Sequence, residues 1–570
     1  MIHRYTLPAL LTSGLLLFTS SAFSQTWQWA VSGGGVDDAF YVGAGYDRVD
    51  DITTDTHGNV YVLSRMNGEV AQVDGHYFNA YNGEVVLSSF RCDGTFRWSR
   101  SFGTPAGVDM GRRIGTDRED GVYVGAWLWY NMGSIGADTS WSWISLGSFV
   151  MKFDTLGTFQ WLRSPEPTTF STLPQNYPMD MDIDEAGNTY MLCAIVEPGA
   201  YGDGTVMIDE PGVHIFKYDR EGVFQEDIEL PMSVNGWQSR SVYMKRDPST
   251  GRFIICGWRY EADGVIIGGQ PVMHPLYVAS FDAQGGLLWE HENTSDLAKG
   301  FNARPAIDAQ GNIYLAGCSA QGDNFLGHAY ENTITGIPYS GPLIVKLNAD
   351  GQLQWGINGS TNASTDARSI VLSGNDVVVS GDYPGALSFP GAQQPLAHVT
   401  NQGYDMYTAR FSKQTGALLR VDTIPSPFGA NEEVFATTVD GEGSLYIGAS
   451  FSTAVMINGQ DVLTSGGDRD MLVAKFGAGT CSASLGITDA APLPTFQLFP
   501  MPATDRVTVQ GAKAGQRLVI QDALGRLVHQ EVLRMDDPVV DIATFARGTY
   551  LVQLMGPGNT NTAARILLKP

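Results

Sequence analysis

The chain has 570 residues, 67 of them glycine, and carries 35 Lys and Arg against 60 Asp and Glu, a net charge of −25. A charged fraction of 17% and an aromatic fraction of 11% exclude a disordered acidic chain, which would be rich in charge and poor in aromatic residues. The acidic balance argues against nucleic acid as a partner, because no basic surface offsets the phosphates. The glycine and aromatic content favours an all-β fold of many short strands joined by tight turns.

Residues 1–24 are typical of a secretory signal peptide. Arg4 precedes an apolar stretch from Leu7 to Phe18, and Ala22-Phe23-Ser24 forms a small-x-small cleavage site before Gln25. The stretch is too short to span a membrane, and no other segment reaches 18 apolar residues. We therefore expect an exported, extracellular protein without a transmembrane segment.

Residues 25–479 contain a repeat of about 65 residues per unit, in seven units. Each unit begins with a turn of Asp-x-x-Gly-Asn type before a strand such as Val60-Tyr61-Val62. The glycines of this turn follow one another at steps of 60 to 69 residues: Gly58, Gly121, Gly187, Gly251, Gly311, Gly374 and Gly443. A second turn, such as that ending at Gly285, leads to a tryptophan four residues later. Two hairpins per unit give four strands, the number in one blade of a β-propeller, so the spacing predicts seven blades.

The last unit lacks its tryptophan strand, and the segment Trp27–Gly34 precedes the first unit as a strand of that kind. We expect this N-terminal strand to complete the last blade and to close the ring without a free edge. The repeats resemble the SBBP-type β-propeller repeats of secreted bacterial proteins, most clearly over residues 381–411 and 448–476. This resemblance implies an architecture and assigns no reaction.

The C-terminal tail differs from the rest of the chain in charge. Residues 490–570 hold 8 Lys and Arg and 6 Asp and Glu (+2), whereas residues 25–489 hold 26 and 54 (−28). Such a shift indicates two modules, with residues 480–494 as a linker rich in Gly, Ala, Ser, Thr and Pro. Short strand candidates over residues 507–568 predict a small Ig-like sandwich.

Residues 495–570 resemble the type A C-terminal sorting domain of the type IX secretion system of Bacteroidetes-type bacteria. The motif residues are Phe499, Pro500, Pro502, Gly525, Gly548, Tyr550 and Lys569, with Met501 where the family usually has Asn. The resemblance implies transport across the outer membrane by that machinery. It further implies removal of the tail, followed by attachment to surface lipopolysaccharide or release.

Local catalytic motifs are absent, and the nine histidines are scattered without metal-ligand spacing. Two groups of residues have two explanations each. The aromatic residues Trp127, Trp129, Trp141 and Trp143 fit either packing against a neighbouring blade or stacking on sugar rings. The acidic runs at Asp180, Asp182 and Asp184 and at Asp468 and Asp470 fit either turn capping or a structural Ca²⁺. We assign no catalytic residue, no metal ligand and no other cofactor.

The five cysteines fall into two groups. Cys193, Cys256 and Cys318 lie on corresponding strands of consecutive units and are expected to be buried free thiols. Cys92 and Cys481 lie near turns of the first and last units, which are neighbours in a closed ring, and their pairing stays open at this stage.

The predicted function is that of a non-enzymatic binding or adhesion module with a glycan or protein ligand. The alternative is a propeller enzyme, either a glycosidase or lyase acting on polysaccharide or a quinoprotein-like enzyme. This alternative stays open because a propeller active site draws single residues from several blades and leaves no local motif.

Overall fold

The computed structural model describes residues 26–35, 47–66, 70–79, 84–103, 109–128, 133–135, 139–141, 147–165, 177–235, 241–260, 264–334, 339–397, 403–424, 431–457, 460–465, 469–477, 481, 497–500, 502–522, 526–555 and 562–569. These residues form strands and no α-helix, which confirms the predicted all-β fold. The predicted signal peptide, and the predicted linker apart from Cys481, lie outside the described residues.

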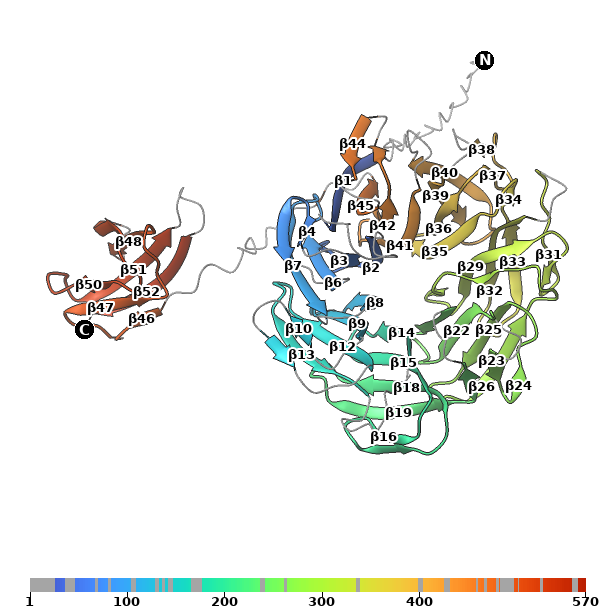
Figure 1. The fold of residues 1–570 in the computed structure, drawn as a ribbon, viewed down its shortest axis with the longest axis horizontal. Helices are drawn as coiled ribbons and strands as arrows, with labels where there is room; N and C mark the ends of the chain where they lie inside the picture. The colour runs from blue at the N-terminus through green and yellow to red at the C-terminus, as the bar shows by residue number, and fades with distance from the viewer. Residues whose placement is uncertain are drawn as a thin grey trace, which may run out of the picture. The chain divides into compact units, whose positions relative to one another are not determined.

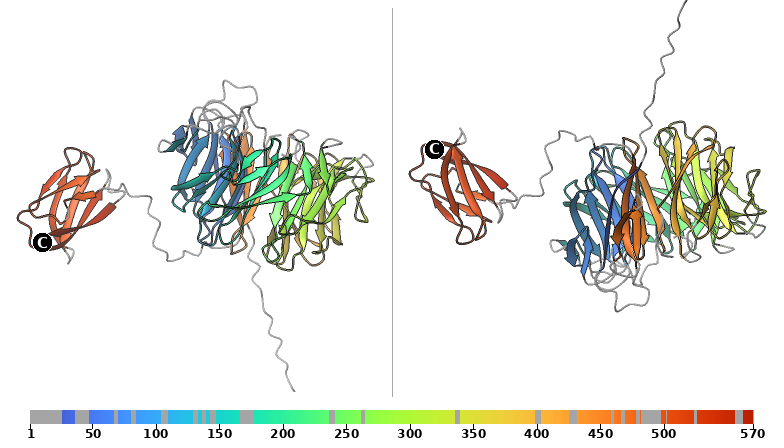
Figure 2. Two further views of the ribbon diagram at one scale, coloured as in Figure 1. Left: turned by 90° about the horizontal axis from the view of Figure 1, so that it is seen from below. Right: turned by 90° about the horizontal axis from the view of Figure 1, so that it is seen from above.

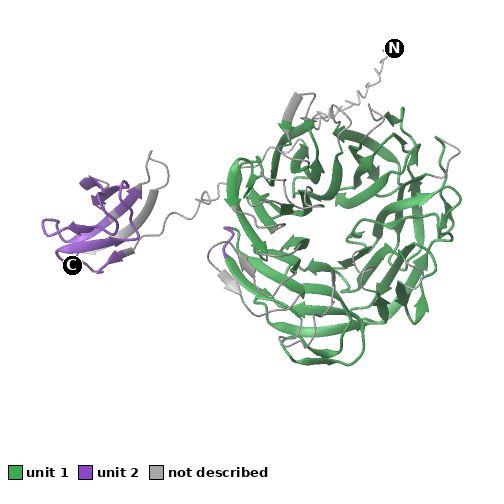
Figure 3. Cartoon of the chain, in the orientation of Figure 1, with its two compact units in different colours: residues 1–155, 159–482 green, residues 156–158, 483–570 purple. Residues whose placement is uncertain are grey.

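The chain divides into two compact units (Figure 3). Unit 1 comprises Met1–Thr155 and Phe159–Ser482, and unit 2 comprises Leu156–Thr158 and Ala483–Pro570.

Seven antiparallel sheets of unit 1 share one strand order and stand around a common centre in a propeller-like arrangement (Figure 1). Taken from the innermost strand outward, they are β2 (Arg48–Thr54), β3 (Val60–Met66), β6 (Glu84–Phe90) and β7 (Phe96–Gly103); β8 (Met110–Thr116), β9 (Val122–Leu128), β12 (Gly147–Phe153) and β13 (Phe159–Arg163); β14 (Tyr177–Ile183), β15 (Thr189–Ile195), β18 (Gly212–Tyr218) and β19 (Phe224–Leu230); β21 (Val242–Arg246), β22 (Phe253–Trp258), β25 (Leu276–Phe281) and β26 (Leu287–Glu292); β27 (Gly300–Phe301) with β28 (Ala306–Ile307), β29 (Ile313–Ala320), β32 (Ser340–Leu347) and β33 (Leu353–Asn358); β35 (Asp366–Ser373), β36 (Asp376–Tyr383), β39 (Asp405–Ser412) and β40 (Leu418–Ile424); and β41 (Glu433–Val439), β42 (Leu445–Phe451), β45 (Asp470–Gly477) and β1 (Thr26–Gly35).

Short hairpins between the second and third strands of a sheet reach the preceding sheet. They are β4 (Val70–Val73) and β5 (His76–Asn79), β10 (Gly133–Ile135) and β11 (Thr139–Trp141), β16 (Gly199–Tyr201) and β17 (Val206–Ile208), β23 (Val265–Ile267) and β24 (Gln270–Pro271), β30 (Asn324–Phe325) and β31 (His328–Ala329), β37 (Ala386–Ser388) and β38 (Leu396–Ala397), and β43 (Ala454–Ile457) and β44 (Gln460–Thr464). In four places the hairpin pairs with a strand of the preceding sheet or just after it: β4 with β1, β10 with β7, β23 with β20 (Met232–Val234), and β37 with β34 (Ser360–Thr361). The pairings of β4 with β1 and of β10 with β7 cover outer strands that would otherwise present a free edge.

The predicted Asp-x-x-Gly-Asn turn is built around one carboxylate. Asp308 Oδ1 accepts hydrogen bonds from the N–H groups of Gln310 (3.0 Å) and Asn312 (2.9 Å), and Oδ2 accepts one from Tyr314 Oη at 2.8 Å. Gly311 has φ +75°, which glycine adopts without steric cost. The same Asp and Tyr, six residues apart, bond in four other sheets: Asp55–Tyr61, Asp117–Tyr123, Asp184–Tyr190 and Asp440–Tyr446.

The tryptophan that follows the second turn docks on the next sheet. Trp289 Nε1 donates a hydrogen bond to Ala349 O at 3.3 Å, and a Cβ at Gly351 would lie 2.8 Å from the indole ring. The same contact recurs for Trp29 with Cys92, Trp98 with Thr155, Trp161 with Arg220 and Trp355 with Lys413. The second-turn glycine therefore serves both the turn and the packing between sheets.

The N-terminal strand lies in the last sheet. β1 pairs with β45 from Thr26↔Gly477 to Gly33↔Met471, so the two ends of unit 1 meet in one sheet. Neighbouring sheets share hydrophobic core clusters. For example, Leu63 and Leu87 of the first repeated sheet pack with Val124 and Met151 of the second. Figure 2 shows the sheets of unit 1 edge-on around the centre.

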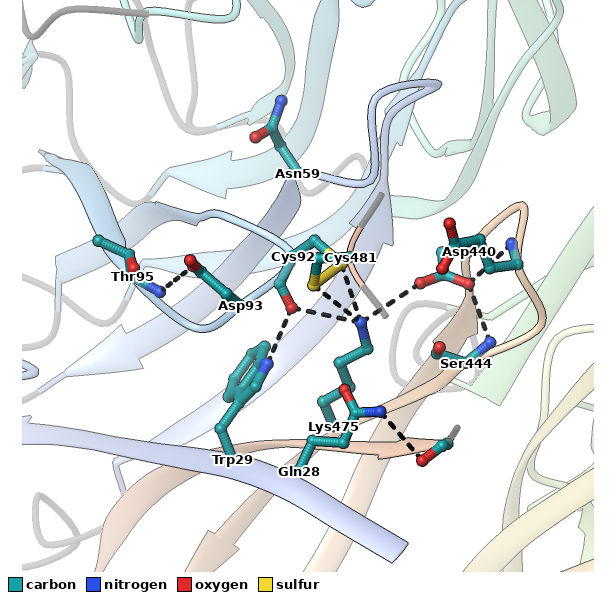
Figure 4. Close-up of a disulfide and its surroundings, with 12 residues drawn as sticks. Gln28, Trp29, Asn59, Cys92, Asp93, Thr95, Asp440, Ser444, Lys475 and Cys481 are labelled. Carbon is teal, nitrogen blue, oxygen red and sulfur yellow. Dashed lines mark hydrogen bonds and ion pairs between the residues drawn. A yellow bond between two sulfur atoms is a disulfide. The ribbon is translucent and has the colours of Figure 1, made fainter. Parts of the chain in front are cut away.

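A disulfide crosses the seam between the last and first sheets (Figure 4). Cys92, in the turn before β7, is bonded to Cys481, which follows β45, and their Cα atoms are 5.6 Å apart. The ammonium group of Lys475 lies beside the disulfide, 2.9 Å from Cys92 Sγ and 3.8 Å from Asp440 Oδ2. Cys193, Cys256 and Cys318 are buried thiols that take part in no disulfide, as expected.

Unit 2 consists of two small sheets that share one core. The sheets are β46 (Gln497–Phe499), β47 (Arg506–Gln510) and β50 (Val539–Asp541), and β49 (Leu527–Val532), β48 (Arg517–Asp522), β51 (Gly548–Met555) and β52 (Thr562–Lys569). Val507 and Val540 of the first sheet pack with Leu518, Ile520 and Val552 of the second. Alternate residues of β47 are buried, which is the pattern of a strand with one face on a core.

Candidate functional site

A cavity of about 690 Å³ lies at the centre of unit 1. Its walls come from β2, β8, β21, β35 and β41 and from the segment Asn302–Ile307. Met179 of β14 also lines it, so residues of all seven repeated sheets meet here, as expected of a site at the centre of a propeller-like fold.

β-Bulges place extra side chains on the wall of this cavity. In five of the innermost strands the pairing register shifts at the third residue of the strand. The bulged residues are Asp50, Arg112, Met179, Arg368 and Phe435, and all five line the cavity. Because a bulge bends its strand and re-aims a side chain, the same local irregularity serves the site five times.

The cations of the wall are more exposed than the carboxylates that hold them. The side chains of the cations are 24% to 35% exposed and those of their partners 2% to 6%, in the pairs Arg48–Asp50, Lys245–Asp182, Arg304–Asp182 and Arg368–Asp382. These four cations therefore face solvent above buried carboxylates, although Arg368 also pairs with Asp366, whose side chain is 27% exposed on the same wall. We call Arg48, Lys245, Arg304 and Arg368 the cation layer.

Asp182 anchors two members of the cation layer. Its Oδ1 lies 2.9 Å from Lys245 Nζ and 2.6 Å from Arg304 Nη2, and its Oδ2 accepts the N–H of Arg246 at 2.8 Å. Burial alone would raise the pKa of Asp182, but Arg304 and Lys245 outweigh it and hold the pKa at about 2. The carboxylate is therefore charged at neutral pH and fixes both cations.

Asp180 ties neighbouring sheets together beneath the cavity. Arg113 Nε donates to Asp180 Oδ1 at 2.5 Å, and the N–H of Met244 donates to Asp180 Oδ2 at 2.7 Å. These contacts join β8, β14 and β21, so the carboxylate positions strands of three consecutive sheets.

Phe435 orients two of the exposed guanidinium groups. The Arg48 and Arg368 guanidinium carbons lie 4.9 Å and 5.7 Å from the centre of the Phe435 ring. Cations over an aromatic face are attracted by the ring quadrupole. The ring thus holds two cations near each other on the wall.

The aromatic residues singled out in the sequence lie in and around β9 and β11. Trp127 in β9 is buried, with 6% of its surface exposed, and pairs with Met110 and Ser148. Trp141 ends β11, where its backbone pairs with Gly133. Trp129 and Trp143 lie outside the described residues, and sugar stacking by this group stays a prediction.

The acidic residues singled out in the sequence have partners within the chain. Asp180 and Asp182 face arginine and lysine side chains, and Asp184 caps its turn through the N–H groups of Ala186 and Asn188. Asp468 lies outside the described residues, and Asp470 is buried at the start of β45.

Among the described residues, Asp55, His57 and Asp120 lie close enough to share a metal ion. Asp55 accepts the N–H of His57 at 2.9 Å, and Asp120 accepts Thr56 Oγ1 at 2.9 Å and contacts His57 Nδ1 at 2.6 Å. These contacts explain the cluster as a link between the turns of two neighbouring sheets.

Sequence reasoning missed the cation layer. The residue four places before the turn aspartate is charged or is a tyrosine in five repeats, namely Asp51, Arg113, Asp180, Tyr243 and Arg304. Aligning the repeats on their turns would have exposed this position. Of the cation layer only Arg304 holds this position, since Lys245 lies two places before Asp247, Arg368 is itself a bulged residue and Arg48 precedes a bulge.

Two of the sorting motif residues, Lys569 and Tyr550, form hydrogen bonds within unit 2. Lys569 Nζ donates to the carbonyl oxygens of Ile542 (2.6 Å), Ala543 (2.7 Å) and Phe545 (2.7 Å), and Tyr550 Oη donates to Ala546 O. Gly548 begins β51, Phe499 and Pro502 are exposed, and Pro500 follows a cis peptide bond. Gly525 lies outside the described residues.

Comparison with protein families identifies the tail. Residues 497–569 match the secretion system C-terminal sorting domain, which confirms the resemblance stated from the sequence. The chain is therefore a secreted or cell-surface protein whose tail interacts with the type IX secretion machinery. Within the part of the chain that the structure describes, no helix has the length and apolar character needed to cross a membrane.

Comparison with curated proteins found no match. Among solved structures, PorZ, a surface component of the type IX secretion system of Porphyromonas gingivalis, is 15% identical over 94% of this chain (TM-score 0.34), and this chain spans 61% of its length. Quinohemoprotein alcohol dehydrogenase from Comamonas testosteroni is 10% identical over 84% of this chain and 79% of its own (TM-score 0.37). A polysaccharide lyase of the ulvan lyase family PL25 is 10% identical over 75% of this chain and 94% of its own (TM-score 0.33).

Proposed function

We propose that this chain is a surface-displayed binding protein that holds an anionic ligand in its central cavity without catalysing a reaction on it. In this proposal unit 1 is a seven-bladed β-propeller of SBBP-type repeats, closed by β1 in the last blade. Unit 2 is an Ig-like sorting domain, removed after export when the propeller is attached to lipopolysaccharide or released. The repeated sheet order and the pairing of β1 with β45 support this architecture.

The observation that carries the binding proposal is the cation layer. Residues 25–489 have a net charge of −28, yet four arginine and lysine side chains on the cavity wall are 24% to 35% exposed, against one carboxylate of the lining, Asp366, at 27%. Their carboxylate partners lie beneath them, so an incoming anion meets the cations first. Each cation is already held in place by a salt bridge, so binding costs little side-chain entropy.

Binding is tested by measuring the affinity of the chain for polygalacturonate, an anionic polymer, and for dextran, a neutral one, at low salt. We expect polygalacturonate to bind, dextran not to bind, and the affinity to fall as salt is added. The double substitution Arg48→Gln and Lys245→Gln should weaken binding about tenfold or more, in line with the loss of two charge-assisted hydrogen bonds.

Arg118→Gln is the matched control, because Arg118 is an exposed cation outside the cavity, paired with Glu185. Its affinity should equal that of the unaltered chain. Equal affinity of the double variant and the control, with both folded, would contradict the proposed site.

A competing proposal is an enzyme that acts on polysaccharide. The observation in its favour is Asp382, a carboxyl beneath the cavity wall whose pKa is raised to about 7 by burial, against the opposing effect of Arg368. Release of sugar products from an acidic polysaccharide, lost on Asp382→Asn, would support this second function over simple binding.

A further inference from the structure

An exposed apolar shelf adjoins the cation layer at the end of β22. Trp258 lines the cavity, and its ring meets that of Tyr260 edge-on, with centroids 5.1 Å apart and planes at 78°. Tyr260 is 69% exposed, and Met273 and Leu297 are also exposed. We call Trp258 and Tyr260 the aromatic shelf.

Backbone and side-chain contacts fix the segments that flank the aromatic shelf. The N–H of Arg259 donates to Pro275 O at 2.9 Å, which fixes the segment of Tyr260 beside the segment of Met273. The N–H of Met273 donates to Glu292 Oε2 at 2.7 Å. The guanidinium of Arg259 pairs with Asp296, next to Leu297, at 2.9 Å.

Trp258 is itself wedged against the start of β27. A Cβ at Gly300 would lie 2.2 Å from Trp258 Cβ, so the chain passes directly against the base of the indole. Trp258 therefore has a fixed position between the solvent-exposed ring of Tyr260 and the cavity that holds Lys245 and Arg304. Trp258 thus shares the cavity lining with Lys245 and Arg304 and contacts the exposed ring of Tyr260, so it links the aromatic surface to the cationic one.

An aromatic surface linked to a cationic one favours some chemical classes of ligand over others. A pyranose ring has an apolar C–H face that packs on an aromatic side chain, and an acidic sugar also carries a carboxylate or sulfate that pairs with arginine or lysine. A flat nucleobase is held best on an aromatic ring lying parallel to it, with further bases stacked in series, whereas Trp258 and Tyr260 are nearly perpendicular. The nearly perpendicular rings of Trp258 and Tyr260 fit the puckered ring of a sugar within an oligosaccharide better than a flat base.

We propose that the ligand is an acidic oligosaccharide. One sugar ring stacks on Tyr260 against the edge of Trp258, and the acidic groups of neighbouring sugars pair with Lys245 and Arg304. This inference rests on the proposed function, because it assigns a chemical class to the anion bound there.

The experiment compares two acidic saccharides, oligogalacturonate and chondroitin sulfate, with polyglutamate, which has carboxylates and no sugar rings. The full chain and its Tyr260→Ala variant are titrated with each. We expect Tyr260→Ala to weaken binding of at least one acidic saccharide about fivefold to tenfold, the equivalent of one lost aromatic contact. Its affinity for polyglutamate should not change.

Tyr260→Phe is the matched control, because it keeps the ring and removes the hydroxyl, and it should bind like the unaltered chain. Tyr260 is exposed, so both variants are expected to fold, which an unchanged melting temperature verifies. Unchanged saccharide affinity in Tyr260→Ala overturns the inference. If the variant of Arg48 and Lys245 still loses affinity, the proposed function survives that result.

Two other outcomes are decisive. If neither acidic saccharide binds the unaltered chain while polyglutamate does, the inference fails and the anion site stands; if none of the three binds, both fail. If a single-stranded oligonucleotide binds more tightly than the saccharides and loses affinity in Tyr260→Ala, the shelf serves nucleobases, and the assignment to oligosaccharide is wrong.

Discussion

Asp382 has an environment unlike that of a carboxyl group in water. It lies directly across from Asp366 in the β35–β36 pair, and its Oδ1 is 2.6 Å from Arg368 Nε. Burial raises its pKa to about 7, Arg368 opposes the shift, and the nearby carboxylates of Asp366 and Glu433 add to it. One guanidinium therefore serves three carboxylates, and the most buried one holds its proton into the neutral range.

This pKa predicts how stability depends on pH. The folded chain keeps a proton on Asp382 that the unfolded chain releases at its ordinary pKa of 3.8, so the contribution of this group is greatest below pH 3.8. The contribution falls by up to about 1.4 kcal/mol per pH unit as the pH rises towards 7. Asp382→Asn should flatten the fall in melting temperature between pH 4.5 and 7 and should melt higher at pH 8.

Asp350→Asn is the control, because Asp350 is an exposed turn residue. Melting curves across this pH range check the prediction. A lower melting temperature for Asp382→Asn at pH 8, with an unchanged pH slope, would show that Asp382 is charged in the folded chain.

A second prediction at the residue scale concerns the aspartates that cap the repeated turns. Asp308→Ala removes the acceptor of the Gln310 and Asn312 N–H groups and of the Tyr314 hydroxyl, so the free energy of unfolding should drop by about 2–3 kcal/mol. Tyr314→Phe removes one hydrogen bond and should cost about 1 kcal/mol. Urea unfolding measures both, and equal losses would contradict the central role of the carboxylate.

At the scale of strands and sheets, neighbours are joined by a small set of repeated devices. A tryptophan donates to a carbonyl of the next sheet, and a hairpin pairs with a strand of the preceding sheet. At the seam the chain adds the Cys92–Cys481 disulfide. The last sheet is also where the two ends of unit 1 meet, because β1 is joined to β45 by hydrogen bonds and not by continuous chain; the disulfide adds a covalent link from the end of β45 to the first sheet.

The disulfide gives a prediction for the seam. Replacing Cys92 and Cys481 by serine frees a loop closed over 389 residues and should lower stability by about 2–5 kcal/mol. Amide exchange in β1 should rise more than in β29, which lies away from the seam. The unaltered chain treated with a reductant is the control and should melt like the double variant. Equal melting of the oxidised and reduced chains would contradict the stabilising role.

At the scale of the whole molecule, the change in net charge along the chain coincides with the division into two units. The acidic unit 1 carries the candidate site, and the near-neutral unit 2 carries the sorting domain with its own core. Each unit buries its own apolar residues, which is the condition for folding independently.

Deletion of residues 483–570 should therefore leave the melting temperature of unit 1 unchanged and should stop its appearance at the cell surface. Lys569→Ala is a milder test, because it removes three hydrogen bonds within unit 2 alone. Cell fractionation and calorimetry check both changes. A large drop in the melting temperature of the truncated chain would show that the units depend on each other.

The sequence by itself determined the all-β class, the repeated turns and the sorting tail. These features are local: an aspartate, a glycine and a tyrosine within seven residues specify a turn such as Asp308–Tyr314 wherever it occurs. The tail motif was read in the same way, from residues close together in the chain.

Only the tertiary structure decided the candidate site and the cysteine pairing. Asp50, Arg368 and Phe435 come together because the sheets stand around one centre and because a bulge turns the third residue of each strand inward. A bulge leaves no mark in the spacing of apolar residues, and the propeller-like arrangement brings together positions hundreds of residues apart. The same arrangement sets Cys92 beside Cys481 and places Trp258 in one lining with the cation layer, since contacts between distant repeats depend on how the sheets pack.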